Sequence, residues 1–313
     1  MPQMPAKTSK TMTPPAVLSV INAKGGVGKT TTTLNIGAGL ARAGYRVLLI
    51  DIDLQQNLTQ SLVGDLAEGE ANIAEVLLGT AALDDLVRPT TTPGLFLVPA
   101  GETLVGLDIT LAGAMAREQI LRNCLQEAAR IREFDVVLID NPPNISLATV
   151  NSVVASSHYL VPVSCEMLPL YGIRLLFENI EKIKRILNPD LALLGVVLTL
   201  YDRREGITER VEETLRRQLG DAVFDTVIRV NTKYKSTALS RQTIFEYEQN
   251  GRGKGSTDYH RLTDEVLVRL QGAGVLPVAA GAAAAARPSS GALDSEETGA
   301  TRNPEPIVLR GRR

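Results

Sequence analysis

The fold is decided by one continuous stretch near the N-terminus, which reads Ala16-Val17-Leu18-Ser19-Val20-Ile21-Asn22-Ala23-Lys24-Gly25-Gly26-Val27-Gly28-Lys29-Thr30-Thr31. It starts with an apolar run that ends at a glycine-rich turn, which predicts a buried strand. The segment from Lys29 to Ala43 has helical periodicity and ends at Gly44. The stretch therefore predicts a strand, a loop and a helix in direct succession.

The loop between that strand and that helix has the chemistry of an anion site. Three glycines allow backbone N–H groups to turn inward around phosphate oxygens, and the following helix points its positive end at the same place. We expect Lys29 to reach the β- and γ-phosphates of a nucleotide and Thr30 to offer its hydroxyl to Mg²⁺. Ala23 stands where the standard G-x-x-x-x-G-K-[ST] pattern has its first glycine. A plain strand-to-helix connection is the alternative, which the Gly-Lys-Thr triplet in this context disfavours.

Apolar runs of strand length recur along the chain and alternate with helical patterns. We expect further strands at 46–50, 95–99, 136–139, 159–163 and 194–200, and helices at 120–132, 172–187 and 208–219. Strands that alternate with helices predict an α/β fold with a mostly parallel central sheet flanked by helices on both faces. We expect residues 16–276 to form this domain, between a disordered, proline-containing lead at 1–15 and a low-complexity, disordered tail at 277–313.

The composition argues against several classes of function. The chain has 313 residues and a formal net charge of −2, so the whole molecule carries no strong electrostatic signal for nucleic acid, although a local basic patch can bind it. No apolar run reaches the ~18 residues of a membrane span and no signal peptide is visible, which predicts a cytoplasmic protein. Cys124 and Cys165 lack metal-ligand spacing, which disfavours an ATPase that carries a metal cluster.

Carboxylates follow two of the predicted strands. Asp51 and Asp53 end one apolar run, and Asp140 ends another. Ligands of open α/β sheets bind at the carboxyl ends of the strands, so these side chains are expected beside the glycine-rich loop. There they could handle Mg²⁺ and water. Strand-end aspartates also cap turns, and for Asp51 this structural role stays an equal alternative.

The glycine-rich loop and three further segments resemble a known family. The run from Lys24 to Thr31 is similar to the signature of the ParA/MinD ATPases, which are dimeric P-loop proteins of the deviant Walker type. The resemblance extends from about Ala16 to Leu270. Within it, residues 48–53 are similar to the family's second motif and 134–143 to its Walker B segment. Residues 187–189 and 195–201 resemble the ParA/Soj branch, which partitions chromosomes and plasmids.

The resemblance implies roles for individual residues. Lys24 would cross a nucleotide-sandwich dimer to touch the partner's phosphates, and Asp53 would orient the attacking water. Asp140 would lie near Mg²⁺ together with Thr30 and Asp53. Asn231 would contact the adenine. The remaining contacts to ATP would come from Gly25, Gly26, Val27, Gly28, Lys29, Thr30 and Thr31.

Two segments depart from the family's pattern. Leu54-Gln55-Gln56-Asn57 stands where relatives have Pro-Gln-Gly-Asn, so the loop after Asp53 has different backbone options. Arg229-Val230-Asn231 stands where they have Pro-Arg-Asn. Both departures fall beside expected site residues, and the first concerns hydrolysis more than nucleotide binding.

A basic stretch near the C-terminal end of the domain predicts contact with DNA. Between Arg229 and Lys254, the cations outnumber the carboxylates, and two tyrosines are interleaved. Such a stretch can bind phosphate backbones without reading bases, and an ordinary solvated surface is the alternative. The residues expected to touch DNA are Lys233, Lys235, Arg241, Arg252 and Lys254.

The function implied by the resemblance is that of a partition ATPase. ATP would drive formation of a sandwich dimer that binds DNA non-specifically and associates with the nucleoid. Intrinsic turnover would be weak, and a ParB-type centromere-binding protein would stimulate it. The alternative is a MinD-like ATPase on a membrane surface. It is disfavoured because residues 305–313 have Pro306 and few apolar side chains, which does not suit a membrane-lying helix.

Overall fold

The computed structural model describes residues 14–165, 169–249 and 253–276. The predicted tail at 277–313, residues 1–13 of the predicted lead and Arg252 lie outside the described residues. The domain boundaries of the sequence analysis therefore stay predictions.

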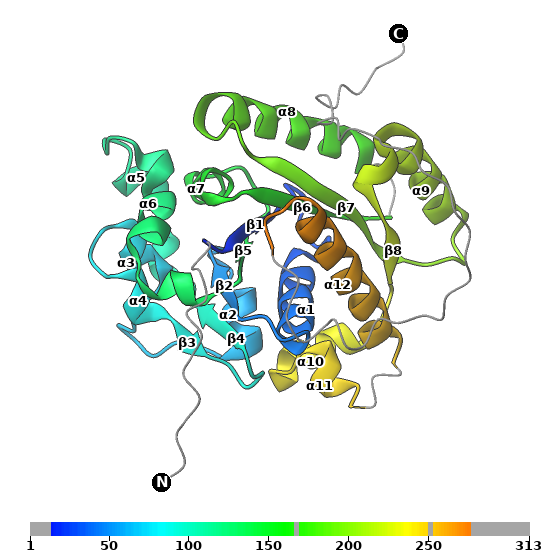
Figure 1. Cartoon of the computed structure of the whole chain (residues 1–313), viewed down its shortest axis with the longest axis horizontal. Coiled ribbons are helices and arrows are strands. Elements are labelled where there is room, and N and C mark those ends of the chain that lie inside the picture. Colours follow the sequence, from blue (N-terminus) through cyan, green and yellow to red (C-terminus); the bar gives the residue numbers. More distant parts are fainter. Residues whose placement is uncertain (1–13, 166–168, 250–252, 277–313) are drawn as a thin grey trace, which may run out of the picture.

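In the described part of the chain, eight strands form one sheet in the order β3-β4-β2-β5-β1-β6-β7-β8 (Figure 1). Neighbouring strands are parallel except for β3 and β4, which are antiparallel. This confirms the predicted mostly parallel sheet. The strands are β1 (Ala16–Val20), β2 (Val47–Asp51), β3 (Arg88–Pro89), β4 (Leu95–Val98), β5 (Val136–Asp140), β6 (His158–Ser164), β7 (Ala192–Tyr201) and β8 (Val223–Arg229).

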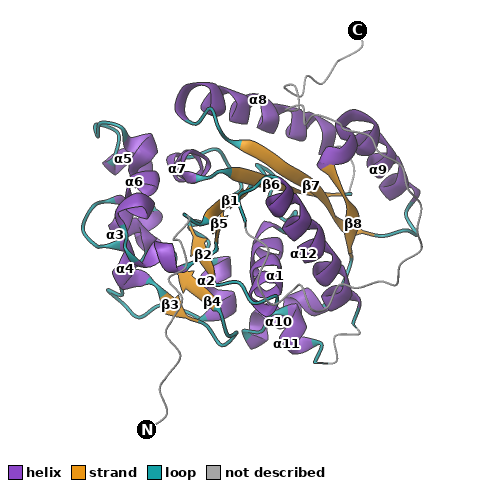
Figure 2. Ribbon diagram, viewed as in Figure 1, coloured by secondary structure: helices purple, strands orange, loops and turns teal. Residues whose placement is uncertain are grey.

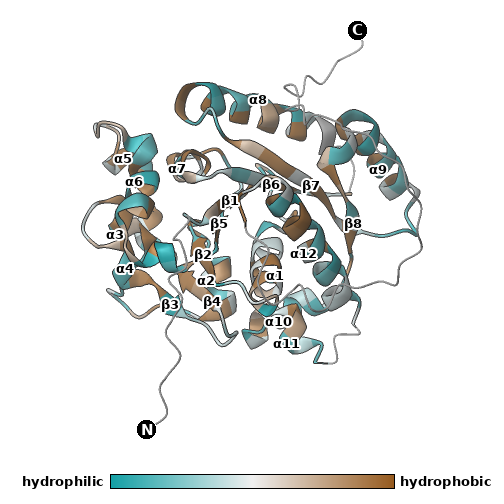
Figure 3. Ribbon diagram, in the orientation of Figure 1, coloured by the Kyte–Doolittle hydropathy of each residue, from teal (hydrophilic) through white to brown (hydrophobic). Residues whose placement is uncertain are grey.

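The central strands are buried on both faces, which explains why they read as continuous apolar runs. Every residue of β2, β5 and β6 is buried. A strand covered on one face only would alternate between apolar and polar residues. In Figure 3 the strands in the middle of the molecule are accordingly mostly brown, the colour of hydrophobic residues. Helices must therefore cover both faces of this sheet.

One face of the sheet packs against the helix that follows the glycine-rich loop. Side chains of β1, β2 and β5 share an apolar cluster with this helix and its neighbours. Figure 2 shows that these helices gather around the lower middle of the view. They are α1 (Lys29–Arg42), α2 (Asn57–Leu62), α11 (Ile244–Tyr247) and α12 (Lys254–Gly272), with α10 (Lys233–Ser240) next to α2 and α11.

The opposite face of the sheet is covered in two parts. Alternate side chains of β2 and β5 pack against α3 (Ile73–Leu77), α4 (Leu83–Leu86), α5 (Leu107–Thr110), α6 (Ile120–Glu127) and α7 (Leu147–Ala155). Side chains of β6 and β7 pack against α7, α8 (Pro169–Leu187) and α9 (Gly206–Leu219). Short 3₁₀ turns complete the connections at Glu102–Leu104, Arg117–Gln119, Arg130–Glu133 and Gly220–Ala222.

One predicted helix is wrong in its length. The pattern at 120–132 predicts one helix, whereas α6 ends at Glu127 and a separate 3₁₀ turn begins at Arg130. The backbone N–H groups of Ala129 and Arg130 donate to the Asp84 carboxylate at 2.9 and 3.1 Å. The carboxylate of a distant segment thus accepts backbone hydrogen bonds that would otherwise form within the helix. Local periodicity cannot reveal this contact.

The helix α1 approaches α12 closely at a glycine. A Cβ atom built on Gly39 would lie 2.2 Å from Oγ1 and 3.0 Å from Cβ of Thr263 on α12. Thr263 is buried, and its hydroxyl donates to the Tyr259 carbonyl at 2.7 Å. The glycine therefore permits the contact between the two helices.

We expect Gly39→Ala to destabilise the protein by about 1–3 kcal/mol because the added methyl group overpacks this contact. Urea unfolding measures the loss. Adding Thr263→Ala makes room for the methyl group and should recover most of the loss. Gly272→Ala is the matched control, because no atom lies within 4 Å of a Cβ at that position. A Gly39→Ala protein as stable as the parent would contradict the close contact.

Candidate functional site

The glycine-rich loop joins β1 to α1 and leaves the first turn of this helix open. Gly26 and Gly28 have φ angles of 74° and 83°, in the left-handed region that favours glycine. Gly28 is the N-cap of α1, and no side chain caps the first turn. The first N–H groups of a helix need partners from outside the helix. An anion in this loop would supply them.

Lys29 places a buried cation inside the loop. The side chain is buried, and its Nζ donates to the Lys24 carbonyl at 3.1 Å. Burial lowers the pKa of the Lys29 ammonium, while the carboxylates of Asp140 and Asp53 oppose this shift. A phosphate in the loop would stabilise the charged form that burial disfavours.

The carboxylate of Asp140 is held by two hydroxyls of α1. Thr30 Oγ1 donates to Oδ2 at 2.7 Å, and Thr33 Oγ1 lies 3.1 Å from Oδ1. Asp140 ends β5, where it is paired with Val20 on one side and Asp51 on the other. Burial raises the pKa of Asp140 to about 8, and the nearby Asp51 adds to the shift. A cation beside this group would favour its charged form.

Asp51 anchors the segment that follows β2. Its carboxylate accepts from the backbone N–H groups of Asp53 and Thr59 at 3.1 and 2.9 Å and from Thr59 Oγ1 at 2.7 Å. Thr59 Oγ1 also accepts from the Ala100 N–H at 2.9 Å. Burial raises the pKa of Asp51 to about 6. These contacts favour the structural role that the sequence left open.

The same segment carries Asp53 to the edge of the site. Asp53 is buried, and its Oδ1 accepts from the Gln55 N–H at 3.0 Å. Gln56 caps α2 with a φ of 55°, a left-handed conformation that is uncommon for a residue other than glycine. The chain therefore adopts a glycine-like backbone at the place where glutamine replaces the family's glycine.

A large cavity connects the loop with α2 and α10. Its volume is about 630 Å³. One wall is made by Gly26, Gly28, Lys29, Thr30, Thr31 and Asp53, and the opposite wall includes Gln60, Tyr234, Lys235 and Arg241. The structure thus brings five of the predicted phosphate-loop residues and Asp53 together around one space, whereas Lys24 and Val27 line another cavity and Gly25 lines neither.

The residues of this cavity fit a nucleotide with Mg²⁺. Among the described residues, no group of three His, Cys, Asp or Glu side chains could hold a metal ion by itself. The Thr30 hydroxyl and the Asp140 carboxylate are hard oxygen donors that lie side by side. Mg²⁺ commonly binds one or two such groups together with phosphates and water. The open first turn of α1 and the buried Lys29 would hold the phosphates.

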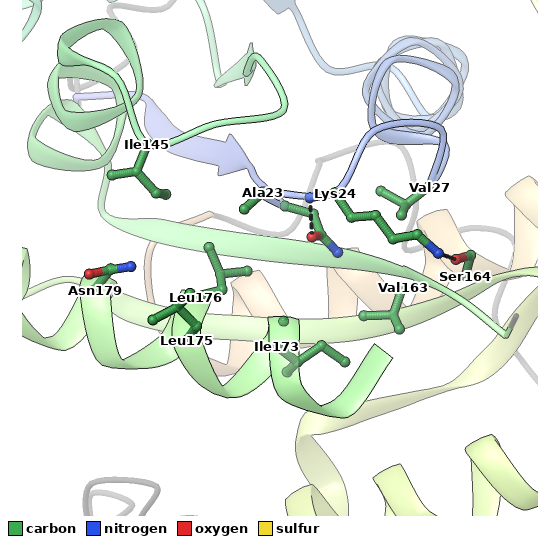
Figure 4. Close-up of a pocket in the computed structure, with 12 residues that line it drawn as sticks. Ala23, Lys24, Val27, Ile145, Val163, Ser164, Ile173, Leu175, Leu176 and Asn179 are labelled. Atoms are coloured by element: carbon green, nitrogen blue, oxygen red, sulfur yellow. Dashed lines mark hydrogen bonds between the residues drawn. The ribbon is translucent and has the colours of Figure 1, made fainter. Parts of the chain in front are cut away.

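Lys24 lies on the other side of the loop. Its side chain extends over a second cavity of about 280 Å³, whose apolar lining includes Ile145, Val163, Ile173 and Leu176 (Figure 4). Its Nζ is 3.4 Å from Ser164 Oγ at the end of β6. In a single chain, Lys24 is thus turned away from the cavity that contains Lys29.

Asn231 also lies apart from the large cavity. Its Oδ1 accepts from the N–H of Lys233, the first residue of α10, at 3.0 Å. Its Nδ2 lies close to Gly255 on α12. The predicted contact with adenine stays a prediction.

The structure divides the basic stretch among different surroundings. Lys233 Nζ forms an ion pair of 2.9 Å with Glu248, whose side chain is 2 % exposed. Lys235 and Arg241 line the large cavity, whereas Lys254 is exposed at the start of α12. Arg252 lies outside the described residues. The sequence could not show this division, because the partner carboxylate and the cavity depend on tertiary contacts.

Thr33 and Tyr234 also belong to the site, although the sequence did not predict them as site residues. Thr33 follows Thr30 by one helical turn, which was the available signal that both hydroxyls could meet one carboxylate. Tyr234 Oη is buried with no hydrogen-bond partner among the described residues, and the residue lines the large cavity. Its position could not be inferred from spacing.

Comparisons with known proteins agree with this geometry. A family model described as "AAA domain" matches residues 15–193. The chain is 38 % identical over 256 residues to the chromosome partitioning protein ParA of Caulobacter vibrioides, covering 82 % of this chain and 95 % of the relative. It is 39 % identical over 254 residues to the chromosome-partitioning ATPase Soj of Thermus thermophilus, covering 81 % of this chain and 96 % of that relative.

A solved structure adds a comparison of folds. Cobyrinic acid a,c-diamide synthase from Mycobacterium smegmatis, with bound ATP analogue and magnesium, has a TM-score of 0.71 and 33 % identity. The match covers 84 % of this chain and 98 % of that one. Within the described residues, no helix has the length and apolar character needed to cross a membrane.

The hydrogen bonds of Thr59 generate a prediction about the site's framework. Thr59→Val should destabilise the protein by about 2–4 kcal/mol, because a buried carboxylate loses a donor and the Ala100 N–H loses its acceptor. Thr59→Ser keeps the hydroxyl and should lower the free energy of unfolding much less. Urea unfolding of both variants decides. Equal stability of the valine and serine variants would show that the hydroxyl does not hold this segment.

Proposed function

This chain belongs to the ParA/Soj branch of the ParA/MinD P-loop ATPases, and we propose that it partitions DNA through an ATP-dependent cycle of dimerisation. ATP would close two copies into a dimer that binds DNA without reading its sequence. Stimulated ATP hydrolysis would then separate the two copies and release them from the DNA. A ParB-type centromere-binding protein is the proposed activator, and the activity is ATP hydrolysis with weak intrinsic turnover.

The observation that carries the proposal is the arrangement at the head of α1. The uncapped start of the helix, Lys29 and Thr30 line one cavity, and the buried Asp140 carboxylate accepts from the Thr30 hydroxyl. ATP and Mg²⁺ are the proposed ligands, and the related structure from Mycobacterium smegmatis contains an ATP analogue and magnesium. Thr30 and Asp140 would hold the Mg²⁺ ion, which would supply positive charge to offset that of the phosphates.

The residues of this chain would share the work of hydrolysis. The N–H groups of α1 and the Lys29 ammonium would bind and orient the phosphates. Thr30 and Asp140 would hold the metal side of the site. Asp53 would orient the attacking water, from a loop that Asp51 fixes through Thr59. The left-handed Gln56 lies in this loop, so its strain falls where turnover would be controlled.

Lys24 would act on the nucleotide of the second copy. Its Nζ is held at 3.4 Å from Ser164 Oγ, at the long end of hydrogen-bond distances. A nearby phosphate of the partner would bind the ammonium more strongly, because an ion pair with phosphate is charge-assisted. Movement of this one side chain would therefore couple nucleotide occupancy to dimer formation.

Two lysine variants distinguish binding from dimerisation. Lys29→Ala should weaken ATP binding by roughly 30- to 100-fold in calorimetry, because a buried charge-assisted contact is lost. Lys24→Ala should change ATP affinity by only a few fold and abolish ATP-dependent dimerisation in light scattering. Lys182→Ala, an exposed change on α8, is the control. Unchanged ATP affinity in Lys29→Ala would refute the site, and a normal dimer in Lys24→Ala would refute the trans role.

DNA binding should depend on the dimer and on salt. A slightly acidic monomer binds DNA weakly, whereas a two-fold dimer presents two basic regions at once. With ATP, unrelated duplexes should bind about equally and lose affinity steeply as salt rises. Lys254→Glu should weaken DNA binding and leave ATP binding intact. Fluorescence anisotropy measures the binding. Binding that is equally tight without ATP, or confined to one sequence, would contradict the proposal.

A further inference from the structure

We infer that Lys235 and Arg241 bind the nucleotide, on the wall of the large cavity that faces the phosphate loop. This assignment rests on the proposed binding of ATP in that cavity. It gives the two residues a different ligand from the DNA that the basic stretch first suggested. Both are exposed to the cavity and can be reached by a ligand.

The two cations share a cavity with the phosphate loop. Lys235 lies on α10 and Arg241 directly follows this helix, which packs against α2. The cavity that they line also contains Lys29 and Asp53. Its volume of about 630 Å³ provides room beyond the phosphates for the ribose and base of a nucleotide.

Arg241 is held in place by an uncommon backbone and by a glycine. Its φ angle is 52°, in the left-handed region, and its N–H donates to the Ala238 carbonyl at 3.3 Å. The guanidinium lies against Gly64, where a Cβ atom would be 2.4 Å from Cζ of the arginine. Any other residue at position 64 would push this group away. The side chain is thus seated between the ends of α10 and α2.

The charges of Lys235 and Arg241 are not compensated within the described part of the chain. Their neighbours Arg229 and Lys233 form ion pairs with Asp258 and Glu248. No ion pair involves Lys235 or Arg241 among the described residues, although Asp53 and Asp65 line the same cavity. Uncompensated cations beside a cavity attract an anionic ligand.

Tyr234 lines the same wall. Its hydroxyl is buried with no hydrogen-bond partner among the described residues. The ring packs edge-on against Tyr259, with 5.8 Å between the ring centroids, which fixes its orientation. The α-phosphate of a nucleotide can pair with the two cations of this wall, and the ribose is bonded to that phosphate. The wall therefore suits the ribose and α-phosphate portion of ATP.

The test compares three glutamine variants in the full-length protein. Lys235→Gln and Arg241→Gln each remove a charge at the cavity, whereas Lys182→Gln removes an exposed charge on α8, outside the cavity lining. Calorimetry with Mg²⁺ gives the affinities for ATP, ADP and inorganic tripolyphosphate. Anisotropy with an ATP analogue at saturating concentration gives the affinity for a duplex.

We expect each cavity variant to bind ATP and ADP more weakly than the parent does. The two affinities should fall by a similar factor, roughly 3- to 10-fold, because one charge-assisted contact is lost. Tripolyphosphate, which lacks ribose, should lose less affinity than ATP. Arg241→Lys keeps the charge and should recover part of the loss, and Lys182→Gln should bind like the parent. Duplex affinity at saturating nucleotide should stay within about twofold of the parent.

The opposite pattern overturns the inference. Unchanged ATP and ADP affinities together with weaker duplex binding would make Lys235 and Arg241 DNA contacts. If Lys29→Ala also left ATP binding unchanged, the proposed nucleotide site itself would fail. If Lys29→Ala weakened ATP binding and the glutamine variants did not, the assignment of Lys235 and Arg241 alone would be wrong.

Discussion

The structure depends on a buried carboxylate that must be satisfied. Asp140 is fully buried at the end of β5, and a charged or polar group in such a place is costly unless it is hydrogen-bonded. Its nearest donors are Thr30 and Thr33 on the first turns of α1. These contacts fix the start of α1 over the end of the sheet. The glycine-rich loop, which carries Lys29 at its end, is thereby anchored to the sheet through α1.

A second set of hydrogen bonds extends this framework to the neighbouring strands. Asp51 connects the end of β2 to Thr59 on α2, and Thr59 reaches Ala100 beyond β4. The same contacts hold the segment that carries Asp53. The opposite wall of the cavity comes from α10, which follows β8 at the far edge of the sheet. Segments that are far apart in the sequence thus surround one space, and nucleotide binding there can affect all of them.

Features that depend on nearby residues could be predicted from the sequence, whereas features that depend on distant contacts could not. The strand, loop and helix around Lys29 could be predicted, because apolar runs, glycines and helical periodicity act within a few residues. The parallel sheet followed from the alternation of strands and helices. The end of α6 depends on Asp84, and the surroundings of Lys233 depend on Glu248, so neither is visible in local patterns. Lys24 contacts Ser164, which lies at the end of β6, far away in the sequence.

The central claim is that two copies enclose ATP, with Asp53 acting in its own subunit and Lys24 in the partner's site. Mixing Lys24→Ala and Asp53→Ala subunits tests this claim most directly. Each variant alone should hydrolyse ATP far more slowly than the parent. In a mixed dimer, one site receives Lys24 from the partner and keeps its own Asp53. Random pairing would give half of the dimers one intact site, so an equimolar mixture should recover activity up to about a quarter of the parent rate, and less where Lys24→Ala weakens pairing. A mixture no more active than its separate components would contradict the account.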